Sequence, residues 1–279
     1  MGYKYLHFHV TPNSKFMFLW LRMYNSQMNK NKNVVISIHQ PGYHRYLGYY
    51  KKIISSDVFI DFNTVQYVSR EWQNRQKFIH NSKEIWLSTP VERGRDIITK
   101  KIIIDNGWRK SHFFILQDIY KKSSFWFEHK DFLKEFYYKK HTHLDKMCNE
   151  MNSYVLSFLD IKTQMYVASE FESEQTYQYK KGRLLAQLIE DLKVIKPELK
   201  DSKITYLSGT GAESYMNSVD ITGKKQVDYF QDNKIEVKYQ KFTPIQYSQT
   251  HSVNNFIPYL SIFDAILNVG KEETIRLLK

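Results

Sequence analysis

Residues 34–54 read VVISIHQPGYHRYLGYYKKII, and this stretch decides the fold. The apolar run at 34–38 is typical of a buried strand, and the Pro-Gly pair that follows it predicts a turn. Residues 46–54 then carry apolar side chains at helical spacing. His39 and Gln40 therefore stand at the carboxyl end of a strand, which is where open α/β sheets place their ligands. The alternative is a simple turn with a solvated histidine.

The rest of the chain continues the alternation of strands and helices. Apolar runs predict strands at 58–62, 84–90, 99–104, 166–168, 204–207 and 235–242. Helical spacing predicts helices at 47–55, 111–120, 131–159, 181–195, 213–216 and 258–267. Such alternation favours an α/β fold with a mainly parallel sheet flanked by helices. No internal repeat or long linker divides the chain, so we expect a single compact domain.

The first 33 residues lack this periodicity and end in MNKNKN. We therefore expect residues 1–33 to be an extension outside the core fold and residues 34–279 to form the α/β domain. One hypothesis is that translation normally starts at Met28. The alternative is a functional arm that packs through its aromatic residues.

Composition limits the class of protein. A chain of 279 residues can bury a core without disulfides, and the single cysteine, Cys148, is compatible with a reducing cytoplasm. The net charge of +12 attracts phosphate-bearing partners without choosing among them, and the lysines are spread as on a solvated surface. No apolar run approaches the ~20 residues of a membrane-spanning helix. We expect a cytoplasmic protein with no integral membrane segment; its oligomeric state is left open.

A second polar cluster, WQNR, occupies residues 72–75. Arginine binds phosphate bidentately, amides pair with hydroxyl groups, and an indole offers a stacking face. This combination suits a hydroxyl-rich or phosphate-bearing ligand; the alternative is a polar loop that caps a strand. Asp57 and Gln66 could complete the site, although Asp57 could equally be a turn residue. The substrate-binding candidates of the cluster itself are Trp72, Gln73, Asn74 and Arg75.

Two later motifs offer further candidates. In the first, NGWRKSH at 106–112, Lys110 could anchor a phosphate or carboxylate and His112 could act as an acid or base. The alternative is a helix start capped by Ser111. In the second, YLSGTGA at 206–212, a strand, a Gly-x-Gly turn and a helix form an anion-friendly helix start. It is neither a P-loop nor a full dinucleotide fingerprint, and a tightly packed turn is the alternative. Its ligand-binding candidates are Ser208, Gly209 and Gly211.

Metal and thiol chemistry find little support. The pairs His7/His9 and His141/His143 lack a recognised metal-site spacing, so no metal or cofactor is expected. His141 and His143 fall on a polar part of the expected helix 131–159, where they should be solvated. Cys148 lies in the same expected helix and should be a core residue.

Six blocks in fixed order resemble the WbqC-like proteins of bacterial polysaccharide gene clusters. They are HQPGYHRYLGYYKKI (39–53), DVFIDFNTVQY (57–67), WQNR (72–75), GWRKSH (107–112), YLSGTGAESYM (206–216) and PYLSIFDAILNVG (258–270). The family usually reads Pro-Trp where this chain has Arg45-Tyr46. The flanking Gln40, Pro41 and Lys52 are kept, and the resemblance adds Lys52 to the substrate-binding candidates.

The resemblance implies a pathway, the assembly of surface polysaccharides such as O-antigen, better than a reaction. One reading is an enzyme that transfers a group, such as an acyl or aminoacyl group, to a nucleotide-linked or amino sugar. Its catalytic candidates are His39, Lys110 and His112. The other reading is a non-catalytic binding or scaffolding protein of the same pathway. No recognition motif supports nucleic-acid binding, so the expected partner is a phosphate-bearing small molecule. If there is one site, residues 39–40, 72–75, 110 and 112 should converge on one cleft.

Overall fold

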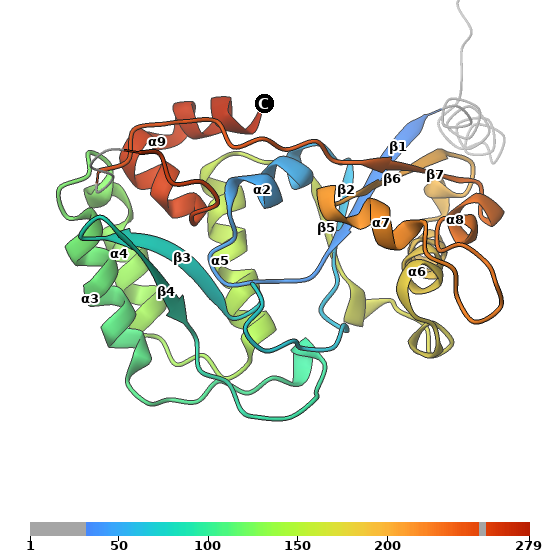
Figure 1. Cartoon of the computed structure of the whole chain (residues 1–279), viewed down its shortest axis with the longest axis horizontal. Coiled ribbons are helices and arrows are strands. Elements are labelled where there is room, and N and C mark those ends of the chain that lie inside the picture. Colours follow the sequence, from blue (N-terminus) through green and yellow to red (C-terminus); the bar gives the residue numbers. More distant parts are fainter. Residues whose placement is uncertain (1–31, 251–254) are drawn as a thin grey trace, which may run out of the picture.

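The computed structural model describes residues 32–250 and 255–279 (Figure 1). It contains a five-stranded, fully parallel sheet in the order β5-β2-β1-β6-β7, so the expected α/β fold is confirmed. The strands are β1 (Asn33–His39), β2 (Val58–Asp61), β5 (Gln164–Val167), β6 (Lys203–Ser208) and β7 (Ile235–Tyr239). The expectations for residues 1–31, including the start at Met28, lie outside the described residues.

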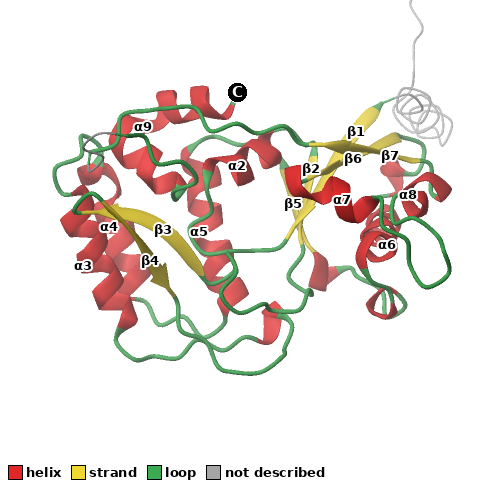
Figure 2. Ribbon diagram, viewed as in Figure 1, coloured by secondary structure: helices red, strands yellow, loops and turns green. Residues whose placement is uncertain are grey.

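Helices cover both faces of this sheet (Figure 2). Side chains alternate between the faces of a strand, so Ile36 and Ile60 share one face and pack with the core side of α6. Phe59 lies on the opposite face, with Tyr49 of α2 and Cys148 of α5. The helices involved are α2 (Leu47–Ile54), α5 (Leu144–Phe158), α6 (Lys181–Ile195), α7 (Glu213–Met216) and α8 (Asp228–Asp232).

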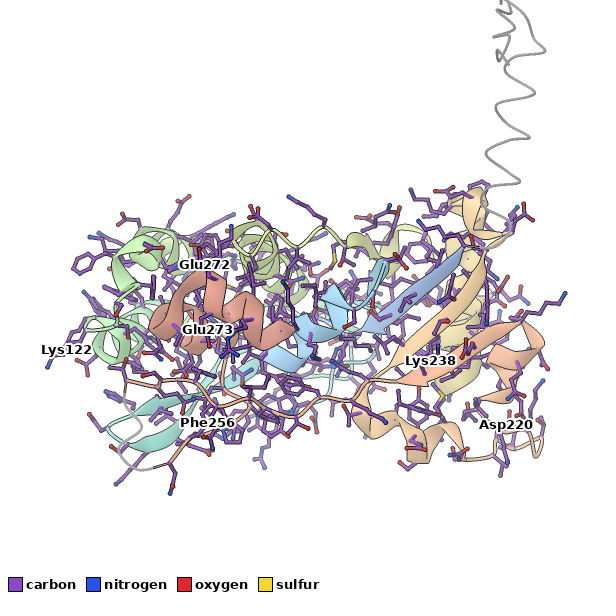
Figure 3. All side chains as sticks on the ribbon, turned by 90° about the horizontal axis from the view of Figure 1, so that it is seen from above. Lys122, Asp220, Lys238, Phe256, Glu272 and Glu273 are labelled. Atoms are coloured by element: carbon purple, nitrogen blue, oxygen red, sulfur yellow. The ribbon has the colours of Figure 1, made fainter. Side chains whose placement is uncertain are left out.

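The remaining elements pack on the α2/α5 side and form a larger, mainly helical core. They are the antiparallel hairpin β3 (Arg75–His80) and β4 (Lys83–Ser88), with α3 (Trp108–Tyr120), α4 (Trp126–Tyr138) and α9 (Ile262–Leu278). In the view of Figure 3, Lys122 and Asp220 mark opposite ends of the molecule, with the helical core at one end and the sheet at the other. No helix within the described residues is long and apolar enough to cross a membrane.

Several expected elements differ from the structure. Residues 99–104 do not form a strand, because Ile102 and Ile103 pair only through single bridges to different partners. The expected helix 131–159 is two helices, since the backbone turns extended at Lys139. His141 in this break is buried and donates from Nε2 to the Phe136 carbonyl at 2.8 Å, so the expectation that it is solvated was wrong. β3 was not expected, and the last helix begins only at Ile262, where the Ser261 hydroxyl accepts from the Phe263 N–H.

The last helix is kinked at Gly270, which has a φ of 75°. A Cβ at this position would meet the Phe125 ring at 2.5 Å. Gly223 has a similar φ of 81°, but a Cβ there would meet nothing within 4 Å. Gly223→Ala should therefore cost only backbone strain, about 1–2 kcal/mol. Gly270→Ala should cost about 1–3 kcal/mol more, because it adds overpacking. Urea unfolding measures both; equal losses would mean that Phe125 does not constrain the kink.

Candidate active site

The carboxyl edge of the sheet contains a topological switch point. From β1 the chain adds β2 and then β5 on one side, and returns to place β6 and β7 on the other. Open α/β sheets bind ligands in the crevice at such a reversal. Here His39 and Gln40 end β1, while Ser208 and Gly209 end its neighbour β6. A Cβ on Gly209 would meet nothing within 4 Å, and the same holds for Gly211, so the backbone beyond β6 borders open space.

Asp61 lies beside His39 at this edge. The two residues are register partners at the ends of β1 and β2, so their side chains share the face covered by α2 and α5. Asp61 is only 3% exposed, and neither carboxylate oxygen has a hydrogen-bond partner of normal geometry among the described residues. Burial raises the pKa of Asp61 to about 7; the nearby Asn149 side chain and Arg45 oppose this rise, whereas Asp145 adds to it.

Two buried cations hold the loop that follows β1. Arg45, 4% exposed, donates from Nη2 to the carbonyl oxygens of Gln40 at 2.8 Å and Pro41 at 2.9 Å. Lys52 of α2 donates from Nζ to the Ile38 carbonyl at 2.8 Å. Burial, followed by the charge of Arg45, lowers the pKa of Lys52 to about 7. Lys52 can therefore lose its proton close to neutral pH.

His39 is a neutral base in this surrounding. Burial lowers its pKa well below the usual value, and the charges of Arg45 and Lys52 lower it further. Its Nδ1 lies 3.0 Å from the Gln40 carbonyl oxygen. A carbonyl can only accept, so Nδ1 carries the proton and Nε2 is the basic atom. The ring stands edge-on to Tyr49, with centroids 5.2 Å apart, and is partly exposed. A partly exposed neutral imidazole can accept a proton from a ligand.

Helix α5 packs against the face of the sheet on which His39 and Asp61 lie. Asp145 is buried and accepts from Asn63 Nδ2 at 3.2 Å, and Asn63 in turn binds Ser169 beyond the end of β5. Burial raises the pKa of the Cys148 thiol, which donates to the Gln73 carbonyl, so it is not an activated nucleophile. Cys148 is a core residue, as expected. Over residues 32–250 and 255–279, no three His, Cys, Asp or Glu side chains are grouped to hold a metal ion.

The WQNR segment fixes the hairpin β3–β4 to the sheet. Gln73 is fully buried; its Nε2 donates to Gln40 Oε1 at 2.8 Å, and its Oε1 accepts from the Val68 N–H at 2.7 Å. Asn74 Nδ2 donates to the Thr89 carbonyl at 2.8 Å. The guanidinium of Arg75 stacks 4.3 Å from the centre of the Trp86 ring, and Trp72 packs on the same ring. The structure therefore joins Gln73 to Gln40. The side-chain amides of Gln73 and Asn74 already bond to groups of the protein, which leaves few of them for a ligand.

The structure places His112 in a hydrogen-bonded network inside the helical core. Its Nδ1 bonds to the Tyr43 hydroxyl at 2.8 Å; Tyr43 bonds to Tyr137, and Tyr137 to His44 Nε2. Burial lowers the pKa of His112 to about 4 and that of His44 to about 3. No hydrogen bond within the described residues joins this network to His39. Its neutral histidines stabilise the core around the first turn of α3.

Three other candidates lie apart from His39. Lys110 is exposed on α3. Asp57 is exposed before the amino end of β2, where it accepts from the Val35 N–H at 2.8 Å, so it lies at the opposite end of the strand from Asp61. Gln66 is exposed and lines a pocket together with Asn74. Sequence reasoning missed Asp61 and Arg45; the expected strand 58–62 placed Asp61 inside it, and only the observed end of β2 and its register with β1 place Asp61 beside His39.

Asp61→Asn should stabilise the protein above neutral pH. The folded state holds the Asp61 proton more tightly than the unfolded chain, so the wild type loses stability as pH rises from the usual pKa of 3.8 to about 7. The variant should be more stable by about 2–4 kcal/mol once the pH is above this range, and the difference should vanish in acid. Urea unfolding across pH measures it, with the exposed Asp201→Asn as control. A variant that is less stable at every pH would contradict the assignment.

Comparison with known proteins confirms the family that the sequence blocks resemble. The model of the WbqC-like protein family matches residues 40–276, which include Arg45 and Asp61. The chain is similar to the uncharacterized protein Rv1507c of Mycobacterium tuberculosis (strain ATCC 25618 / H37Rv), with 26% identity over 242 residues, 85% of this chain and 94% of the relative. No solved structure matches the chain significantly. The chain therefore belongs to the WbqC-like protein family.

Proposed function

We propose that this protein is a group transferase of surface-polysaccharide assembly that acts on a nucleotide-linked or amino sugar. The observation that carries the proposal is the pair of His39 and Asp61 at the carboxyl edge of the sheet, beside the switch point. Burial, with the charges of Arg45 and Lys52, lowers the pKa of the histidine, and burial raises that of the carboxyl group to about 7. Titratable groups shifted in this way are typical of acid–base sites.

The chemistry that fits this pair is transfer of an acyl or aminoacyl group to an amine or hydroxyl. The acceptor attacks the acyl carbonyl, and His39 Nε2 takes the proton that the acceptor releases. His39, protonated by this transfer, can return the same proton to the leaving group, while the buried Asp61 lies beside it and does not contact the substrate. Lys52 and Arg45 place positive charge beside the edge where the carbonyl oxygen would become negative.

The remaining candidates receive binding roles in this proposal. Gln40 and the backbone at Gly209 and Gly211 would border the substrate at the switch point, because they follow the ends of β1 and β6. Ser208 ends β6 but is buried, so it would only support this edge. Lys110 and His112 receive no catalytic step, since one is exposed on α3 and the other is bonded within the core. We propose a cytoplasmic location and a phosphate-bearing small molecule, rather than nucleic acid, as the partner.

The second candidate function is non-catalytic ligand binding in the same pathway. The observation that favours it is that protein groups already bind Arg45, Lys52 and Gln73. Side chains that keep these hydrogen bonds would shape a binding surface and would not take part in a reaction. The two functions differ in turnover, and both predict binding.

His39→Gln separates the two functions. A thermal-shift screen of nucleotide sugars and activated acyl donors first identifies ligands of the wild type. If His39 is the base, the variant should bind within a few-fold of the wild type but turn over roughly 10²- to 10⁴-fold more slowly. The matched control is His143→Gln, a partly exposed histidine in the link before α5. Binding that weakens with no turnover in any variant would favour the non-catalytic function.

The pH profile of the wild type gives a second readout of this experiment. A general base works only when it is neutral, so activity falls as pH drops through its pKa. Because the pKa of His39 is well below 6.5, kcat/KM should not fall until the pH is clearly below that value. A fall toward acid pH that is centred at 6.5 or above would assign the base to another group.

A further inference from the structure

We propose that the loop around Arg93 and Arg95 is an anion-binding subsite that holds the phosphate groups of the substrate. The loop lies between β4 and α3 (Figure 1) and borders a pocket. This inference rests on the proposed function for the identity of the ligand, and on the residues of the pocket for its chemistry. The pocket is lined by Gln66, Tyr67, Val68, Ser69, Asn74, Val91, Glu92, Arg93, Gly94 and Arg95.

A buried lysine holds the loop in one shape. Lys101 is 0% exposed, and its Nζ donates to the carbonyl oxygens of Glu92 at 3.1 Å and Gly94 at 2.9 Å and to Asp96 Oδ2 at 3.1 Å. These three bonds use all three protons of the ammonium group, which is the condition under which a charge can be buried at low cost. The Tyr67 ring lies 5.1 Å from the same Nζ. The loop is therefore preorganised.

The two arginines stand on either side of Gly94 and are free to bind a ligand. Both are exposed, and neither guanidinium forms an ion pair or hydrogen bond with another described residue. Gly94 has a φ of 127°, a conformation that only glycine adopts readily, so the sharp turn between them depends on this residue. Asp96 is directed to Lys101, and Glu92 is the acidic residue of the pocket lining. Two guanidinium groups and one carboxylate leave the pocket net positive, and guanidinium groups bind phosphate bidentately.

Gln73 connects this pocket to the carboxyl end of β1. Its Oε1 accepts from the N–H of Val68, which lines the pocket, and its Nε2 donates to Gln40 Oε1. One buried side chain therefore stands between the two regions. The exposed Gln66 offers amide groups that pair with hydroxyls. The chemistry of the pocket suits a phosphate ester with free hydroxyl groups, such as a sugar nucleotide whose sugar reaches Gln40 and His39.

Calorimetric titration with uridine diphosphate glucose and with inorganic pyrophosphate tests the subsite. The double variant Arg93→Gln/Arg95→Gln should weaken binding of both probes by roughly tenfold or more. The matched control Lys140→Gln/Lys200→Gln removes the same charge from two exposed sites and should change either Kd by about twofold at most. Gln66→Ala should weaken binding of the sugar nucleotide and leave binding of pyrophosphate unchanged.

The outcomes separate this inference from the proposed function. Arginine-dependent binding without turnover in any assay would support the subsite and count against the transferase. Turnover that survives in Arg93→Gln/Arg95→Gln with an unchanged KM would overturn the subsite alone. Equal weakening in the control variant would show attraction by net charge, and absence of binding to the wild type would also overturn the subsite.

Discussion

The site depends on the hydrogen bonds that the buried guanidinium of Arg45 makes to the loop after β1. Its two hydrogen bonds to the carbonyl oxygens of Gln40 and Pro41 fix the loop between β1 and α2. A Cβ at Gly42 would lie 2.2 Å from its Nε, so the glycine provides the space for this side chain. The charge of Arg45 also acts on its neighbours, because it lowers the pKa of His39 and of Lys52.

Burial of so many charged groups in one place requires that some of them be neutral. An isolated charge in a protein interior costs several kcal/mol and usually shifts its pKa instead. Here burial favours neutral His39, lowers the pKa of Lys52 to about 7 and raises that of Asp61 to about 7. Burial therefore leaves Lys52 and Asp61 with pKa values near 7. Groups that change protonation near neutral pH are the ones that proton transfer at that pH needs.

The local sequence pattern predicted those strands and helices that depend mainly on neighbouring residues. The run 34–38 and the strand-end His39 were predicted and are confirmed as β1, and helix α6 was predicted at its observed bounds. The turn expected at Pro41-Gly42 lies two residues later, at Tyr43 and His44, where His44 has a φ of 49°. Asp61 could not be selected, because its place beside His39 depends on the register of β1 with β2. The three hydrogen bonds of Lys101 join partners that the local run of isoleucines does not reveal. The expected strand 99–104 failed because Ile102 and Ile103 pair only through single bridges to distant residues. The site roles of the WQNR residues remain predictions.

The protonation of His39 tests the central claim most directly. Nuclear magnetic resonance of imidazole-labelled protein can follow each histidine across pH, with the His39 signal assigned by its loss in His39→Gln. The structure predicts that His39 stays neutral to a pH well below 6.5, with the proton on Nδ1. The same titration in Arg45→Met should shift its midpoint upward, because a positive neighbour is removed. A midpoint at or above 6.5 in the wild type, or a proton on Nε2 of the neutral ring, would contradict the assignment of His39 as the base.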